Sequence, residues 1–220
     1  MTATLPIAQT SETQSAITPE QALEMLRDGN RRFLEGNPIE RPLDAQVEAT
    51  ASGQYPFAVV LGCIDSRVPV ETIFDQGIGD VFTARVAGNI VNADLLGSME
   101  FACKLAGSKA IVVLGHTSCG AVKGAIGKAR LGNLTRLVRK IEPVVDRVVY
   151  ESELDREDPE LADTVAEANV LATMEAIREE SPVLAEMEAA GEIAIVGAMY
   201  DVTSGAVRWL FFLMMRRPPR

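Results

Sequence analysis

The stretch Ala58-Val59-Val60-Leu61-Gly62-Cys63-Ile64-Asp65-Ser66-Arg67 decides the fold that we expect for this chain. Its first half is apolar and β-branched, and its second half carries a thiol, a carboxylate and a guanidinium. It therefore predicts a buried strand that ends in a functional loop. The stretch Ala110-Ile111-Val112-Val113-Leu114-Gly115-His116-Thr117-Ser118-Cys119-Gly120 has the same layout. Helical patterns separate such strands along the chain, which predicts an α/β fold with a mostly parallel β-sheet flanked by helices.

Two thiols and an imidazole follow these two strands. Ligands of open α/β sheets bind at the carboxyl ends of the strands, so Cys63, His116 and Cys119 can converge on one point. Two Cys and one His are a ligand set of catalytic zinc sites, which keep a fourth position open. The chain contains one His and three Cys in all, so their grouping carries weight. The alternative is that buried Cys and a hydrogen-bonded core His only fill the interior.

At these residues the sequence resembles the β-class carbonic anhydrases. The resemblance rests on Cys63-x-Asp65-Ser66-Arg67, on Ala84-Arg85-Val86-Ala87-Gly88-Asn89 and on His116-Thr117-x-Cys119-Gly120-Ala121, and it extends from about Pro19 to about Trp209. It implies a zinc enzyme that reversibly hydrates carbon dioxide to bicarbonate and a proton. It also implies one Zn²⁺ per chain, held by Cys63, His116 and Cys119.

The resemblance implies that Asp65 and Arg67 are the catalytic pair beside the metal. An Arg guanidinium can hold a carboxylate in a bidentate pair and keep it off the metal, so Asp65 is left to orient the attacking oxygen. The alternative is a surface ion pair of little energetic value. Two thiolates cancel the formal charge of zinc, so we expect the pKa of a zinc-bound water to be higher than in an all-histidine site. Activity is therefore expected to rise toward alkaline pH.

The resemblance also implies substrate-binding residues. Gln54 matches a glutamine that binds substrate, while Phe82 and Ala87 match the apolar side of the carbon dioxide pocket. Phe101 matches an aromatic residue of the adjoining subunit, which implies a homodimer or a dimer-based tetramer. Considered without the resemblance, these four are core or loop residues. Gly120 begins a predicted helix whose amide groups would face an anion such as bicarbonate.

Some members of the family close their own site under the control of bicarbonate bound to a Trp, an Arg and a Tyr. The motifs align Val60, Arg85 and Tyr200 with these positions, so the Trp is absent here. A ligand shifts an equilibrium only by its differential affinity for the two states. We therefore expect an open site at neutral pH, with Asp65 paired to Arg67.

The length of 220 residues fits one domain. We expect a flexible N-terminal tail over residues 1–17 and a single domain over residues 18–220 with an N-terminal helical arm. Thr18-Pro19-Glu20-Gln21 predicts the start of a helix that runs to about Leu34. In the family this helix packs on a neighbouring subunit, and the alternative is a helix on its own core. Residues 36–53 are expected to form an extended connection.

Composition limits the partners. The net charge of −10 and the pI of about 4.7 argue against nucleic acid and against an anionic membrane, so carbon dioxide and bicarbonate are the expected partners. No signal peptide is visible, and no apolar run is long enough for a membrane span. Together with the odd number of cysteines, this favours the cytoplasm. Cys103 has no partner motif and is expected to be a small core residue.

Three other functions deserve comparison. A zinc nucleobase deaminase also uses His and Cys ligands, but its motifs are missing. A hydrolase of carbon disulfide or a related sulfur substrate is the alternative within the family, and the motifs do not separate it from a carbonic anhydrase. A non-catalytic zinc or redox module would need a fourth protein ligand, for which Cys103 or a carboxylate remains.

Overall fold

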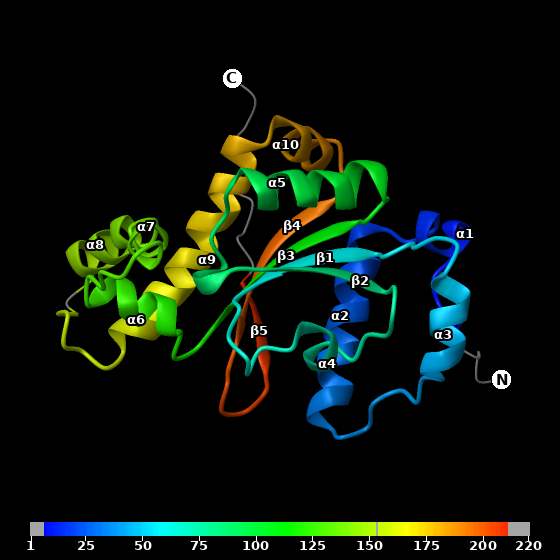
Figure 1. Cartoon of the computed structure of the whole chain (residues 1–220), viewed down its shortest axis with the longest axis horizontal. Helices are drawn as coiled ribbons and strands as arrows, with labels where there is room; N and C mark the ends of the chain where they lie inside the picture. Colours follow the sequence, from blue (N-terminus) through cyan, green and yellow to red (C-terminus); the bar gives the residue numbers. More distant parts are fainter. Residues whose placement is uncertain (1–6, 153, 211–220) are drawn as a thin grey trace.

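The computed structural model describes residues 7–152 and 154–210. Within them the chain forms a five-stranded sheet in the order β2-β1-β3-β4-β5 (Figure 1). The strands are β1 (Ala58–Gly62), β2 (Val81–Arg85), β3 (Ala110–His116), β4 (Ala194–Tyr200) and β5 (Val207–Leu210). The first four are parallel and β5 is antiparallel to β4, so the predicted fold class is confirmed.

Helices cover both faces of the sheet. They are α1 (Ser11–Ser15), α2 (Pro19–Leu34), α3 (Leu43–Thr50), α4 (Val70–Ile73), α5 (Ala93–Glu100), α6 (Gly120–Ile126), α7 (Leu134–Val138), α8 (Glu142–Glu151), α9 (Leu161–Glu180) and α10 (Pro182–Ala189). A π-helical turn, Phe101–Leu105, continues α5, and a 3-10 turn spans Ala87–Asn89. In Figure 1, α5 and α10 lie above the sheet, and α2 and α4 lie below it. None of the described helices is long and apolar enough to cross a bilayer.

The two faces of the sheet bury alternate residues of the same strands. Val59 and Leu61 belong to the core under α5 and α9, whereas Ala58 and Val60 belong to the core under α2 and α4. Successive side chains of a strand point to opposite faces, and both faces are covered here. This explains why every residue of β1 and β3 is buried and why their sequences are almost continuously apolar.

The N-terminal region differs from the sequence-based expectation in two places. Helix α1 lies in the described part of the segment predicted to be a flexible tail, and Thr10 caps it by accepting a hydrogen bond from the Thr13 amide. The prediction of an extended connection over residues 36–53 was wrong for α3. That helix has no side-chain cap, and its contacts are tertiary: Gln46 donates to the Ile7 carbonyl and accepts from the Ile78 amide.

Helix α2 begins as predicted, with a capping box between Thr18 and Gln21. Its apolar residues, including Ala22 and Leu26, are buried against this chain's own sheet. The structure thus shows the alternative in which the helix packs on its own core. The predicted closing strand over residues 206–213 is present as β5, and residues 211–213 lie outside the described part of the chain.

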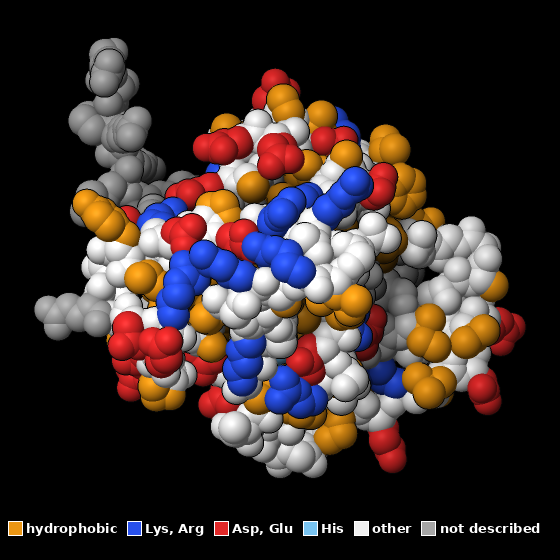
Figure 2. Space-filling view, turned by 60° about the vertical axis from the view of Figure 1, so that its left-hand side comes forward, with side chains coloured by type: hydrophobic (Ala, Val, Ile, Leu, Met, Phe, Trp, Pro, Cys, Tyr) orange, Lys and Arg blue, Asp and Glu red, His pale blue; other side chains and the backbone are white. Residues whose placement is uncertain are grey.

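Charge is unevenly distributed over the surface. Figure 2 brings forward the side of the molecule that carries α6, α7 and α8, and Lys and Arg side chains form a band across it. Exposed basic residues of this region are Lys123, Lys128, Arg130, Arg136, Arg139, Lys140 and Arg147. The net charge of −10 therefore does not describe every face of the molecule.

Candidate metal centre

The three predicted ligands meet at the carboxyl ends of two neighbouring strands. Cys63 follows β1, His116 ends β3, and Cys119 precedes α6. Parallel pairing sets Gly62 of β1 opposite Leu114 of β3, which brings the two loops together. One donor atom from each of the three side chains lies within 4.8 Å of the others, and all three residues are buried.

The loop between His116 and Cys119 is held from both sides. Ser118 adopts a left-handed conformation with φ of 54°, which turns the chain back toward the centre. Its amide donates to Asp163 Oδ1 at 2.7 Å, and its carbonyl accepts from Arg67 Nη2 at 3.3 Å. The Thr117 amide donates to the Tyr200 carbonyl at 2.9 Å. Helix α9, β4 and the β1 loop therefore fix the position of the imidazole together.

The donor atoms have the chemistry of a metal site. His116 Nδ1 donates to the Thr117 carbonyl at 2.9 Å, which leaves Nε2 as a lone-pair donor. This Nε2 is buried and has no hydrogen-bond partner among the described residues. A buried nitrogen without a partner costs free energy, and a metal ion at this position removes the cost. The residues therefore fit a zinc ion.

Cys63 has the environment of a metal-binding thiolate, whereas its contact with Cys119 raises the pKa of the Cys119 thiol. Cys63 Sγ shares a hydrogen bond with the Cys119 thiol and accepts from the Gly88 amide at 3.3 Å, and these bonds hold the pKa of Cys63 well below its usual range. A thiolate rather than a thiol binds metal. Cys103, by contrast, is a buried core residue outside this group, and burial raises its pKa to about 12. The prediction that it belongs to the core is confirmed.

Asp65 forms the predicted pair with Arg67 beside the centre. Arg67 Nε donates to Oδ1 at 2.9 Å and Nη2 donates to Oδ2 at 2.8 Å, which is a bidentate arrangement. The Arg67 guanidinium and the backbone amide of Arg67 outweigh partial burial and hold the pKa of Asp65 far below its usual value. Asp65 Oδ2 is 3.9 Å from His116 Nε2, so an ionised carboxylate borders the three donor atoms.

The residues that the resemblance aligns with a bicarbonate-dependent closure have structural contacts here. Arg85 Nε donates to the Cys63 carbonyl at 2.8 Å and Nη2 donates to the Asp65 carbonyl at 2.6 Å, so Arg85 holds the backbone of the ligand loop. Val60 is fully buried in the core under α2, and Tyr200 lies opposite His116 in the sheet.

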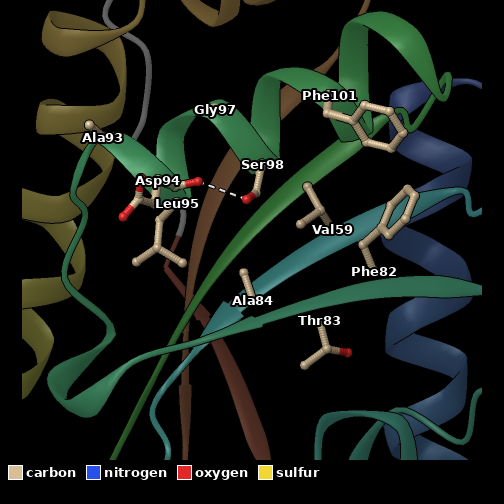
Figure 3. A pocket seen from close by; sticks show the side chains of 10 residues that line it. All are labelled: Val59, Phe82, Thr83, Ala84, Ala93, Asp94, Leu95, Gly97, Ser98 and Phe101. Atoms are coloured by element: carbon tan, nitrogen blue, oxygen red, sulfur yellow. Dashed lines mark hydrogen bonds between the residues drawn. The ribbon is translucent and has the colours of Figure 1, made fainter.

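The predicted substrate residues fall into two groups. Ala87 and Gly120 border the centre: Ala87 precedes the Gly88 amide that contacts Cys63, and Gly120 follows Cys119. Phe82 and Phe101 lie elsewhere, with ring centroids 6.2 Å apart in an edge-to-face contact. Figure 3 shows both rings at one end of a cavity of about 720 Å³ between α5 and β2.

The second group is displaced from the centre of its own chain. Phe82 is paired with Val59 in the sheet, whereas Cys63 follows the far end of β1. Gln54 is exposed in the loop before the amino end of β1. None of the three donor residues lines the cavity that contains Phe82 and Phe101. Within one chain, the structure therefore does not bring Gln54, Phe82 or Phe101 to the metal ligands.

Two residues of α9 contact the centre's loops although the motifs predicted no role for them. Asp163 binds the Ser118 amide, and Asn169 Nδ2 donates to the Gly88 carbonyl at 2.8 Å. No local pattern links α9 to either loop, because these contacts exist only once the helix packs on the sheet.

The fold and the donor set define an α/β protein with a candidate metal site of three side-chain donors at the ends of parallel strands. Comparison with known proteins narrows this class. The family model described as carbonic anhydrase matches residues 58–207. The chain belongs to the β-class carbonic anhydrases, and its activity is that of a carbonate dehydratase.

Relatives cover most of the chain. Carbonic anhydrase 2 of Mycobacterium tuberculosis is 39% identical over 189 residues, which cover 85% of this chain and 90% of that protein. The carbonic anhydrase of Mycolicibacterium smegmatis is 37% identical over 195 residues, with coverage of 86% and 92%. The β-carbonic anhydrase CafA of Aspergillus fumigatus matches with a TM-score of 0.68 and 32% identity, over 87% of this chain and 89% of that chain. A tetrameric β-carbonic anhydrase of Sordaria macrospora also gives a TM-score of 0.68, at 27% identity and coverage of 76% and 90%.

Proposed function

We propose that this carbonic anhydrase binds one zinc ion per chain through Cys63, His116 and Cys119 to interconvert carbon dioxide and bicarbonate. The observation that supports this most strongly is the convergence of three buried donor atoms within 4.8 Å, one of them an imidazole nitrogen without a hydrogen-bond partner among the described residues. When bound, zinc lowers the pKa of water and so supplies a nucleophile near neutral pH.

Asp65 and Arg67 orient the reaction. Arg67 donates twice to Asp65 Oδ1, from Nε and from its backbone amide, and once to Oδ2, from Nη2. The remaining lone pair of Oδ2, the oxygen that lies 3.9 Å from His116 Nε2, can accept a hydrogen bond from an oxygen at the centre. This bond aims the attacking oxygen at the carbon of carbon dioxide, which is an orientation effect. Ala87 provides an apolar contact for the substrate, and the Gly120 amide faces the bicarbonate oxygens.

Metal analysis tests the ligand set. The wild type is expected to retain close to one zinc per chain, and Cys119→Ala and His116→Ala are expected to lose most of it. Cys103→Ala is the matched control, because this thiol is buried outside the donor group and its loss should leave the zinc content unchanged. Full zinc retention in Cys119→Ala would contradict the assignment.

Stopped-flow hydration of carbon dioxide tests the orienting role. Asp65→Asn keeps the shape of the side chain but removes its charge and weakens its hold on Arg67. With zinc still bound, its hydration rate is expected to fall by roughly 100-fold, since a misdirected nucleophile costs about that factor. A rate within about twofold of the wild type would refute the role of Asp65.

A homodimer is the proposed smallest active unit. Its support is that Gln54, Phe82 and Phe101 lie away from their own chain's donors, while β2 forms the edge of the described sheet. Beside this edge, Phe101 is 49% and Leu105 is 76% exposed, which is unusual for large apolar side chains. The second copy would then receive these residues into its own site, and dimers can pair into a tetramer.

Analytical ultracentrifugation tests the assembly. The double variant Phe101→Glu with Leu105→Glu is expected to sediment as a monomer and to lose hydration activity. Leu131→Glu is the control, because Leu131 is also exposed, at 72%, but lies outside the cavity that contains Phe101. A fully active wild-type monomer at the assay concentration would rule the dimer out as the smallest active unit.

We also propose a cytoplasmic location. All three cysteines are free and buried, and two of them are the proposed zinc thiolates, which a reducing compartment protects from oxidation. Cell fractionation with detection in the cytosolic fraction tests this, and recovery from the membrane or the secreted fraction would contradict it.

A further inference from the structure

The turn Ala87–Asn89 connects α9 to a metal ligand through two hydrogen bonds at Gly88. The Gly88 amide donates to Cys63 Sγ at 3.3 Å. The Gly88 carbonyl accepts from Asn169 Nδ2 at 2.8 Å. Both bonds are buried, and Asn169 is only 2% exposed. They belong to different peptide units that meet at the Gly88 Cα, so the position of one affects the direction of the other.

Gly88 has little freedom to move. It adopts a left-handed conformation with φ of 73° and ψ of 20°. A Cβ atom at this position would lie 2.6 Å from Ile141 Cδ1 and 3.2 Å from the Ala121 Cβ, so the turn is packed closely against the start of α6 and against Ile141. The carbonyl of Gly88 faces α9. The bond from Asn169 is therefore the polar contact that holds the turn from that side.

Asn169 has no evident purpose in α9 apart from this bond. Asparagine is a weak helix former, and a buried amide without a partner costs about 1–3 kcal/mol. Its neighbours Val165, Ala166 and Val170 are buried apolar residues of the core. A leucine would fill the same space without a polar group, so the amide is explained by the Gly88 carbonyl that it meets.

We propose that Asn169 is a positioning residue for the metal centre: through Gly88 it aims a backbone N–H at the Cys63 thiolate. This bond withdraws electron density from the sulfur and fixes the direction of its lone pairs toward the metal. Partners of metal ligands commonly change metal affinity by about 10-fold to 100-fold when they are removed. The inference rests on the proposed zinc binding and adds a residue fifty positions beyond the last ligand.

Metal affinity and cobalt spectra test the proposal. In Asn169→Leu, the zinc dissociation constant, measured by competition with a chromophoric chelator, is expected to rise by about 10-fold or more. The thiolate-to-cobalt charge-transfer band of the Co²⁺-loaded variant is expected to shift, because the sulfur has lost a hydrogen bond. Asn169→Asp keeps the side-chain shape but replaces the donor with a carboxylate, and it should show the same changes.

Thr173→Val is the matched control. Thr173 is buried one turn further along α9, so a nearly isosteric change there tests whether any disturbance of the helix weakens the metal. We expect its affinity and its cobalt band to match the wild type. Equal weakening in Asn169→Leu and Thr173→Val would overturn the proposal, as would an Asn169→Leu variant with wild-type affinity and spectrum.

The wild type provides a test that does not depend on a folded variant. With NMR-active cadmium bound, spin coupling across the hydrogen bond is expected between the metal and the Gly88 amide proton. If no coupling is observed, the hydrogen bond from the Gly88 amide to Cys63 Sγ is not formed, and the proposal fails. If the wild type bound no zinc, the proposed function itself would fail. Zinc binding that is insensitive to Asn169 would defeat only the positioning role of Asn169.

Discussion

Gly88 combines a left-handed backbone conformation with close packing, so both constrain the residue at this position. Its positive φ and the short approach to Ile141 both exclude a side chain. Gly88→Ala is expected to lower the free energy of unfolding by about 2 kcal/mol or more, as measured by urea denaturation.

Gly124→Ala is the control for this substitution. Gly124 lies inside α6, and a Cβ there would meet Val138 at an ordinary contact distance of 3.5 Å. Alanine is therefore expected to stabilise the protein by about 0.5–1 kcal/mol. Equal effects of the two substitutions would show that the backbone conformation at Gly88 is not the cause.

Asp75 is a buried carboxylate on which two guanidinium groups converge. Arg32 Nε and Arg41 Nη1 each donate to it at 2.5 Å. Burial alone would raise the pKa of Asp75, but the hydrogen bonds from Arg32 and Arg41 outweigh it, and the pKa lies below its usual value. The interaction therefore stabilises the fold above the unfolded pKa of about 3.9 and loses this effect as the pH falls through the folded pKa.

Asp75→Asn leaves both arginines without their charged partner. It is expected to lower the free energy of unfolding by about 3 kcal/mol at neutral pH. The difference from the wild type should shrink as the pH is lowered from about 5 to about 3. Urea denaturation over this range measures it. Asp28→Asn, which removes an exposed i,i+3 partner of Arg31, should change little at any pH. A difference that grows toward acid would contradict the expected direction of the pH dependence.

Residue chemistry explains why the ligands and the Asp65–Arg67 pair could be predicted from sequence. The end of a buried strand has few structural uses for thiol, imidazole, carboxylate and guanidinium groups. The strands themselves were recognisable from their apolar, β-branched sequences. Asp163 and Asn169 could not be predicted in the same way. Their partners are backbone atoms of distant loops, and any segment has such atoms.

At the scale of elements, α1 is a docked helix. Gln14 is buried, and its Nε2 donates to the Pro56 carbonyl at 2.8 Å and to the Ala106 carbonyl at 2.7 Å. Gln14→Ala is expected to lower the free energy of unfolding by about 1–3 kcal/mol, because two carbonyl groups lose a donor. Thermal or urea unfolding measures the effect. Ser15→Ala, on the exposed side of α1, should be nearly neutral, and a neutral Gln14→Ala would show that α1 contributes little to the fold.

Elements were predictable where their signal is local. The α2 capping box lies within four consecutive residues, and the apolar runs of β1 and β3 are continuous. Helix α3 has neither a local capping box nor a continuous apolar run. Pro42 precedes it without a side-chain cap, and Gln46 attaches it to distant segments. The packing of α2 on its own sheet was likewise not decided by its spacing, because an apolar face fits either subunit.

For the whole molecule, zinc is expected to act as a stabilising ligand. The donors come from two strands and a helix start, so the unfolded chain does not hold them together. At free zinc about 1,000-fold above its dissociation constant, the folded state gains about 4 kcal/mol. Removing zinc with a chelator is therefore expected to lower the Tm by roughly 10 °C. The Cys119→Ala variant should not respond, and a wild-type Tm unaffected by metal removal would contradict the prediction.

The order of the segments along the chain has a consequence for biosynthesis. Cys63, His116 and Cys119, with the strands that carry them, are synthesised before α8, α9 and β4. Asn169 follows later, so the nascent protein has its thiols before it has the amide that supports the Gly88 turn. Until α9 emerges and packs across β3, the core that contains Cys63 and Cys119 lacks the α9 residues that belong to it. Synthesis of the last third of the chain is therefore the step that completes the core around the centre.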